Sequence, residues 1–168
     1  PTGIFTALDA NTNVEIVSTT AATIGLVDLQ KLRRSVPVRH RGSGKWLMNP
    51  IWGDAVKALG TAWSASFSGD ITEGNTNRLL GSEVVESDEA PSAVTTTVKD
   101  NEIIFGDFKS SYVIVDKPGS TSLDYIPVLT GGTANRPLGA RGWYMRFRSG
   151  ADSVNDLAFR LLQDKTSA

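Results

Sequence analysis

The chain of 168 residues contains no cysteine and a single histidine, His40. The lack of cysteine excludes disulfides, thiolate metal sites and cysteine catalysis, and one imidazole cannot build a histidine-rich metal cluster. No apolar run approaches the ~18 residues that a membrane helix needs, so no membrane contact is expected. The formal net charge of −1 excludes a general attraction to nucleic acid, which leaves at most weak, non-specific contact with DNA through a local basic patch.

What remains is an ordinary globular composition, with 40% hydrophobic and 21% charged residues. The length corresponds to about one domain and is sufficient for a hydrophobic core. The first residue is Pro1 rather than methionine. We therefore expect the chain to be the C-terminal portion of a longer polypeptide.

The first half of the chain predicts strands mixed with helices. After a turn-rich start over residues 1–13, we expect strands at residues 14–17, 45–48 and 62–67 and a helix from the hydroxyl-rich residues 19–23 to Val36. The clearest signal is a second helix, with Asn49 as its N-cap, Pro50 at its first position and Gly60 at its end. Its predicted buried face comprises Ile51, Trp52, Ala55, Val56 and Leu59.

The second half is rich in short β-branched and aromatic runs that Gly, Pro, Asp or Ser interrupt, a pattern typical of buried strands with tight connections. Residues 123–128 predict an extended arm, and residues 130–139 a flexible loop. Trp143, Met145 and Phe147 alternate with Tyr144, Arg146 and Arg148, which indicates a strand with a basic outer face. A last apolar segment surrounds Phe159. Strands mixed irregularly with helices predict an α+β domain.

Three stretches that could carry chemistry do not fit a catalytic motif. The Gly42-Ser43-Gly44-Lys45 stretch lacks the first glycine and the final hydroxyl of a phosphate-binding loop. His40 has no nucleophile motif to serve and is expected on the surface among arginines, and Asp107 is expected as a turn carboxylate. We therefore expect no catalytic, cofactor-binding or metal-binding residue, and a protein that is not an enzyme.

Two clusters of charge stand out. The basic one contains Lys31, Arg33, Arg34, Arg39, Arg41 and Lys45, and the acidic one contains Glu83, Glu86, Asp88 and Glu89. They can be two solvated faces, or complementary surfaces on neighbouring copies of the chain, where opposite charges set orientation. A nucleic-acid patch is a third reading, although Trp46 is the only aromatic residue close to the basic run.

Several motifs occur in an order that resembles a known family. Pro1-Thr2-Gly3-Ile4 and Trp46-Leu47-Met48-Asn49-Pro50 come first. Leu79-Leu80-Gly81, Val84-Val85, Ser87-Asp88 and Pro91 follow, then Phe105-Gly106-Asp107-Phe108 and Tyr112-Val113-Ile114. Arg146-Phe147-Arg148-Ser149-Gly150 and Ala158-Phe159 complete the set. Together they resemble the major capsid (coat) protein of tailed phages and prophages, of the Hong-Kong-97 type.

The resemblance implies a fold, a domain plan and partners. The fold would be the α+β capsid shell fold, an axial domain with a central mixed sheet flanked by helices, plus part of an elongated peripheral-domain sheet. Residues 1–12 would be a peripheral-domain tail, 13–116 the axial domain, 117–148 the extended peripheral arm, and 149–168 a return to the axial domain. The chain would assemble with copies of itself in the virion capsid, after assembly in the bacterial cytoplasm, and its full-length form would meet portal, scaffold and maturation protease.

Under this resemblance the charged clusters become candidate inter-subunit contacts. Pentamers and hexamers require two unlike, complementary edges on each subunit. The expected contacts join the basic cluster of one subunit, with Arg33, Arg34, Arg39 and Arg41, to Glu83, Glu86, Asp88 and Glu89 of its neighbour. Two alternatives stay open at this point: the shell of an encapsulin-like bacterial compartment, and an unrelated small α+β ligand-binding or hydrolytic domain.

Overall fold

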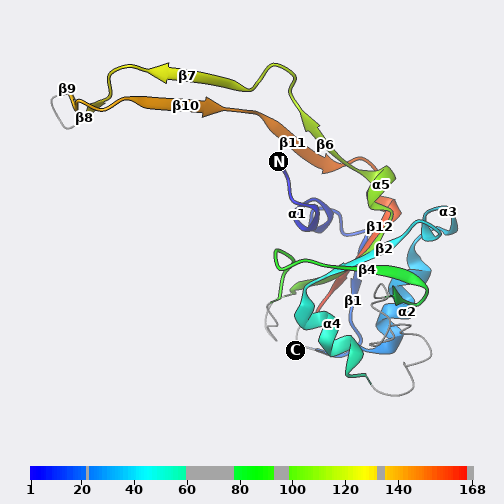
Figure 1. The fold of residues 1–168 in the computed structure, drawn as a ribbon. Helices are drawn as coiled ribbons and strands as arrows, with labels where there is room; N and C mark the ends of the chain where they lie inside the picture. Colours follow the sequence, from blue (N-terminus) through cyan, green and yellow to red (C-terminus); the bar gives the residue numbers. More distant parts are fainter. Residues whose placement is uncertain (22, 60–77, 93–98, 132–134, 166–168) are drawn as a thin grey trace, which may run out of the picture. The chain divides into compact units, whose positions relative to one another are not determined.

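The computed structural model describes residues 1–21, 23–59, 78–92, 99–131 and 135–165. The chain divides into two units: Thr2–Val113 with Asp152–Ala168, here the sheet unit, and Pro1 with Ile114–Ala151, here the arm unit (Figure 1). The strand predicted at residues 62–67 and the helix end predicted at Gly60 lie outside the described residues.

The sheet unit is built on a six-stranded mixed sheet in the order β1-β12-β5-β2-β4-β3. Its strands are β1 (Glu15–Val17), β2 (Lys45–Met48), β3 (Arg78–Leu79), β4 (Ser82–Glu86), β5 (Asn101–Gly106) and β12 (Phe159–Gln163). The pairs β1–β12 and β2–β4 are parallel, and β12–β5, β5–β2 and β4–β3 are antiparallel. The α+β prediction with a central mixed sheet is confirmed.

Helices α2 (Leu26–Ser35) and α4 (Pro50–Lys57) lie on one side of this sheet (Figure 1). The strands contribute alternate residues to this side, including Trp46, Ile103 and Phe105, all fully buried. The rings of Trp46 and Phe105 lie 4.4 Å apart, and the indole N–H of Trp46 donates to the carbonyl of Leu79 at 2.9 Å. The buried indole is therefore both packed and hydrogen-bonded.

The opposite side of the sheet carries helix α1 (Ile4–Asp9) and the short helix α5 (Phe108–Ser111). Here Ile104, Phe159 and Leu161 pack with Leu8 of α1. The turn-rich start predicted for residues 1–13 is thus wrong over α1. Its sequence has few helix signals, but burial of Leu8 against the sheet supplies the stabilisation that local propensity lacks.

Helix α2 begins later than predicted. Its N-cap is Gly25, not one of the threonines upstream, and Asp28 provides the capping interactions. The Asp28 carboxylate accepts hydrogen bonds from the backbone N–H of Gly25 and of Thr19, each at 3.0 Å. A carboxylate in the first turn also interacts favourably with the helix dipole. The hydroxyl-rich segment therefore precedes the helix, and its Thr19 is hydrogen-bonded to Asp28 in the first turn.

Helix α4 begins as predicted, with the Asn49 side chain accepting from the backbone N–H of Ile51 at 3.1 Å. The predicted buried face is right for Trp52 and Val56 but wrong for Ile51, which is 58% exposed, and for Ala55. Gly53, which is not in the predicted buried face, is buried. A Cβ there would lie 3.0 Å from a carboxylate oxygen of Glu86, so the helix turns this small residue toward the sheet.

The remaining elements of the sheet unit are α3 (Val38–Arg41) and the 3-10 helix η2 (Asp156–Ala158). The strands β6 (Tyr112–Asp116) and β11 (Ser149–Ser153) form a two-stranded sheet of their own.

The arm unit contains an antiparallel ribbon of β7 (Ser122–Ile126) and β10 (Gly142–Arg146). The strand predicted from residue 143 onward is confirmed. Beyond the ribbon, β8 (Thr130–Gly131) pairs with β9 (Arg136–Pro137), so the segment predicted as a loop is partly a paired hairpin.

Candidate functional site

The basic cluster predicted from the sequence gathers where α2 ends and α3 begins. Arg33 and Arg34 occupy the last turn of α2, and Arg41 lies in α3. The guanidinium of Arg41 donates through Nη2 to the carbonyls of Arg34 and Val36, at 2.8 and 2.9 Å. These bonds satisfy carbonyls that the end of α2 leaves without a helical partner, and they place Arg41 beside the two arginines of the helix.

These arginines line a surface depression of about 310 Å³, together with Gln30 and Leu80. The lining contains three guanidinium groups and, among the residues that the structure describes, no acidic side chain. The Nε atoms of Arg33 and Arg41 are buried and have no hydrogen-bond partner among the described residues. We call this feature the arginine depression. Its chemistry suits an oxyanion, because guanidinium groups bind carboxylates and phosphates through paired N–H donors.

The fourth predicted arginine, Arg39, does not line this depression. Its Nε donates to Nε2 of His40 at 2.9 Å. The other ring nitrogen, Nδ1, lies 3.8 Å from Asp107, and the His40 side chain is only 17% exposed. His40 is therefore partly exposed beside an arginine, as predicted, and in addition lies close to a carboxylate.

The prediction of Asp107 as a turn carboxylate is confirmed, since it accepts from Ser110 Oγ at 2.6 Å. Burial raises the pKa of Asp107, but hydrogen bonds from Ser110 and Ser43 and the nearby His40 outweigh it. The pKa of Asp107 therefore lies below its ordinary value.

The four predicted acidic residues have two different environments. Glu83 lies 2.6 Å from Lys45 and Glu86 lies 3.7 Å from Lys57, both within the chain. Asp88 and Glu89 are exposed in the turn after β4, here the acidic turn, and form no ion pair among the described residues. The four residues are close in sequence, but the structure separates them into two glutamates that pair with lysines of the same chain and two exposed carboxylates without an ion pair among the described residues.

The acidic turn is held firmly by its backbone. The amide of Asn49 donates to the carbonyls of Asp88 and Ala90, at 3.4 and 3.0 Å, and the backbone N–H of Ser87 donates to Met48. Asn49 is 6% exposed. Through its hydrogen bonds the side chain both caps α4 and fixes the turn. The two carboxylates are therefore presented from a defined backbone.

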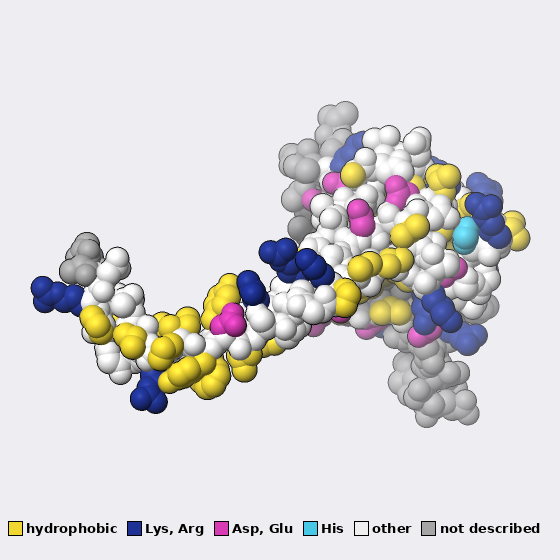
Figure 2. All heavy atoms as spheres, turned by 90° about the horizontal axis from the view of Figure 1, so that it is seen from above, with side chains coloured by type: hydrophobic (Ala, Val, Ile, Leu, Met, Phe, Trp, Pro, Cys, Tyr) yellow, Lys and Arg dark blue, Asp and Glu magenta, His cyan; other side chains and the backbone are white. Residues whose placement is uncertain are grey.

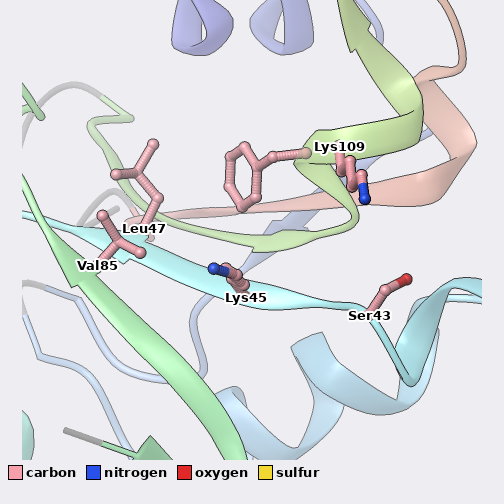
Figure 3. A pocket seen from close by; sticks show the side chains of 6 residues that line it. Ser43, Lys45, Leu47, Val85 and Lys109 are labelled. Atoms are coloured by element: carbon pink, nitrogen blue, oxygen red, sulfur yellow. The ribbon is translucent and has the colours of Figure 1, made fainter. Parts of the chain in front are cut away.

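A second depression of about 390 Å³ lies on the other face of the sheet. Figure 3 shows Leu47 and Val85 side by side on the neighbouring strands β2 and β4, with Lys45 on the same strand as Leu47. Phe108, Ser43 and Lys109 complete the lining. Val85, which lines this depression, is 39% exposed.

The arm ribbon has one apolar and one polar face. In the antiparallel register Leu123 pairs with Met145 and Tyr125 with Trp143, so these four side chains share a face. All four are at least 45% exposed, and Figure 2 shows hydrophobic side chains gathered along this ribbon. Exposed apolar faces of this kind are frequent at protein interaction surfaces. The basic outer face is present too, since Lys117, Arg146 and Arg148 line a depression of about 230 Å³.

Sequence reasoning missed Glu102, which is fully buried on β5. Neither carboxylate oxygen has a hydrogen-bond partner among the described residues. Burial, and then repulsion from Asp164, Asp100 and Asp28, raises its pKa to about 8. Glu102 lies in an irregularity of the β5–β12 pairing: Leu162 pairs with Ile103 and Gln163 with Asn101, so Glu102 is the extra residue on β5. The hydrophobic pattern of β5 gave no signal for this bulge.

Within the ranges that the structure describes, no group of three His, Cys, Asp or Glu side chains is placed to hold a metal ion. In the same ranges, no helix is long and apolar enough to cross a membrane.

Solved capsid and encapsulin structures have a similar fold. The chain matches the capsid of an empty GTA particle, computed with C5 symmetry, with a TM-score of 0.66 and 20% identity over 90% of this chain and 50% of that one. The capsid of cyanophage P-SCSP1u gives a TM-score of 0.53 and 17% identity, over 92% and 53% of the two chains. The holo-SrpI encapsulin complex from Synechococcus elongatus PCC 7942 gives 0.57 and 14%, over 92% and 55%. These similarities define a capsid-type shell fold and confirm the predicted fold.

The sequence model of the phage capsid family matches residues 1–164, nearly the whole chain. The chain belongs to the phage capsid family. This membership confirms the predicted family and overturns the alternative of an unrelated ligand-binding or hydrolytic domain. No curated protein sequence matches the chain significantly. The chain spans about half the length of the shell proteins whose structures it matches.

Proposed function

We propose that the chain is the shell-building part of a structural capsid subunit, which assembles with copies of itself into pentamers and hexamers around the genome of a tailed phage or prophage. The family match over residues 1–164 is the observation that carries this proposal. The shell fold supports it, because the matched GTA capsid was computed with C5 symmetry. The role is structural, and we propose no enzymatic activity.

The proposed domain plan assigns residues 13–116 and 149–168 to the axial domain, and residues 117–148 to the peripheral arm, with residues 1–12 as a peripheral tail. The division into Thr2–Val113 with Asp152–Ala168 and Ile114–Ala151 supports the arm boundaries to within a few residues. Helix α1 packs on the sheet through Leu8, which favours placing residues 4–9 with the axial domain instead.

Subunit contacts in this proposal use both units. The apolar face of the arm ribbon, with Trp143 at 69% exposure, would be covered in an assembled shell. Charged contacts would join the basic residues Arg33, Arg34, Arg39 and Arg41 to the acidic residues Glu83, Glu86, Asp88 and Glu89 of a neighbour. Such contacts set orientation more than affinity. Glu83 and Glu86 each lie near a lysine of the same chain, so we assign the contact to Asp88 and Glu89 of the acidic turn.

In its natural full length the subunit would also meet a portal, a scaffold and a maturation protease. It would assemble in the bacterial cytoplasm and reside in the virion capsid. Contact with packaged DNA would be weak and non-specific, given the net charge of −1.

An encapsulin-like compartment is the second candidate, favoured by the match to the SrpI complex. Expression of the natural full-length polypeptide followed by electron microscopy of the particles tests both. Closed shells that contain DNA in the producing phage or prophage support the capsid. Shells that enclose a protein cargo and no DNA support the compartment, and failure to form any shell under all assembly conditions contradicts the proposed function.

A further inference from the structure

The arginine depression and the acidic turn lie at opposite ends of one strand. Leu80, which lines the depression, precedes β4, and Asp88 and Glu89 follow it. β4 has five residues, so at about 3.3 Å per residue its ends lie roughly 13 Å apart. No ion pair joins the two groups in the described part of the chain. The arginine depression and the acidic turn, which have opposite charge, therefore lie on separate parts of the sheet unit.

We propose that the arginine depression of one subunit binds the carboxylates of the acidic turn of the next subunit in the ring. This inference rests on the proposed shell function and names the partner of that contact. A ring needs a heterologous contact, in which two unlike surfaces of the same chain meet. The arginine depression and the acidic turn are two such surfaces, and their charges are opposite.

The arginine depression is suited to bind an oxyanion. Arg41 is oriented by its two bonds to the end of α2, so its guanidinium is held in place before any ligand binds. Three guanidinium groups line the depression and can donate charge-assisted hydrogen bonds to carboxylate oxygens of a neighbour.

The acidic turn is likewise ordered before it meets a partner. Asn49 fixes the backbone of the acidic turn, so binding its two carboxylates costs little loop ordering. The paired glutamates Glu83 and Glu86 take no part, because each already has a lysine partner. The geometry thus narrows the predicted contact to Arg33, Arg34 and Arg41 on one side and Asp88 and Glu89 on the other.

Charge reversal in the full-length polypeptide tests the contact. Arg34→Glu, and separately Asp88→Lys with Glu89→Lys, are expected to lower the yield of assembled particles by about tenfold or more, because like charges would then face each other. All three residues are exposed, so each variant should keep its fold, which circular dichroism checks. Lys31→Glu is the matched control: the same charge change on an exposed residue of α2 outside the depression should leave assembly unchanged.

A double-mutant cycle decides whether the two surfaces meet each other. Arg34→Gln and Glu89→Gln should each raise the subunit concentration needed for assembly, and the combined variant should raise it by less than the product of the two effects. Independent, multiplying effects would overturn the proposed pairing while the wild-type shells still support the proposed function. If the wild type itself forms no shells, the proposed function fails instead.

The same variants test whether the arginine depression binds another anion. If Arg34→Glu abolishes binding of a short DNA duplex or of inorganic phosphate to the subunit, while reversal of the acidic turn leaves assembly intact, then the depression binds phosphate groups and the proposal is wrong. Unchanged phosphate and DNA binding in Arg34→Glu, together with lost assembly, is the result expected here.

Discussion

Lys45 and Glu83 face each other across the parallel strands β2 and β4, with Nζ and the carboxylate oxygen 2.6 Å apart. Both belong to the charged clusters that the sequence singled out, yet they pair within one chain. The two clusters are therefore not wholly separate surfaces, because neighbouring strands bring one member of each together. What remains available to a second subunit is the arginine depression and the acidic turn.

The Lys45–Glu83 pair should contribute little to folding stability. Its side chains are 48% and 39% exposed, and exposed ion pairs contribute roughly 0.2–1 kcal/mol. A double-mutant cycle with Lys45→Met and Glu83→Gln, measured by urea unfolding, should give a coupling energy in that range that shrinks with added salt. A coupling several times larger that salt does not change would contradict this prediction.

Asn49→Ala should destabilise the protein by about 2–4 kcal/mol, since it removes a helix cap and leaves buried carbonyls of the acidic turn without their donor. Asn49→Asp is the matched control. It keeps the acceptor for the backbone N–H of Ile51 but loses the amide donor, so its loss should be intermediate. Chemical unfolding measures both, and equal losses in the two variants would show that the cap contributes nothing.

Glu102 should make stability fall as pH rises. Its pKa is raised to about 8 in the folded protein, so the folded state retains a proton that the unfolded chain releases above its ordinary pKa. The contribution of this group is therefore fully present below that ordinary value and is lost as pH rises through the folded pKa. Each unit of pKa shift corresponds to about 1.4 kcal/mol.

The variant Glu102→Gln removes this titration. Relative to the wild type, its free energy of unfolding should increase steadily from pH 5 to pH 8 and then level off, as the folded pKa of about 8 implies. Thermal or urea unfolding at several pH values measures the difference. A difference that stays constant across this range would show that Glu102 does not titrate in the folded protein.

Gly106→Ala should destabilise the sheet by about 1–3 kcal/mol or more through overpacking. A Cβ at this position would lie 2.6 Å from the carbonyl oxygen of Ala158 and 2.8 Å from the Cα of Phe159, and backbone atoms cannot move aside cheaply. Gly42→Ala is the control, because nothing lies within 4 Å of its added Cβ. The melting temperatures of the two variants compare them, and equal effects would refute the steric argument.

Local sequence signals predicted a helix or strand correctly where residues close together in the chain stabilise it. Asn49 and Pro50 start α4 because capping and a fixed φ act within a few residues. The alternation of Trp143 and Met145 with polar neighbours likewise predicted β10. The order of motifs from Pro1 to Phe159 was sufficient to predict the family.

Long-range packing decided the features that the sequence analysis missed. Helix α1 is stabilised by the burial of Leu8 against the sheet, and α4 is oriented so that Gly53 is buried near Glu86 while Ile51 is exposed. The bulge at Glu102 arises from the pairing of β5 with β12, whose residues lie far apart in the chain.

The sequence by itself determined the family, the fold class and the presence of two opposite charge clusters. Only the tertiary structure decided which charges neutralise each other and which face outward. The reason is physical: residue types are local properties, whereas the partner of each charge depends on which strands become neighbours. Lys45 meets Glu83 because β2 pairs with β4, and Asp88 and Glu89 remain exposed because the turn that carries them lies beyond the end of that pairing.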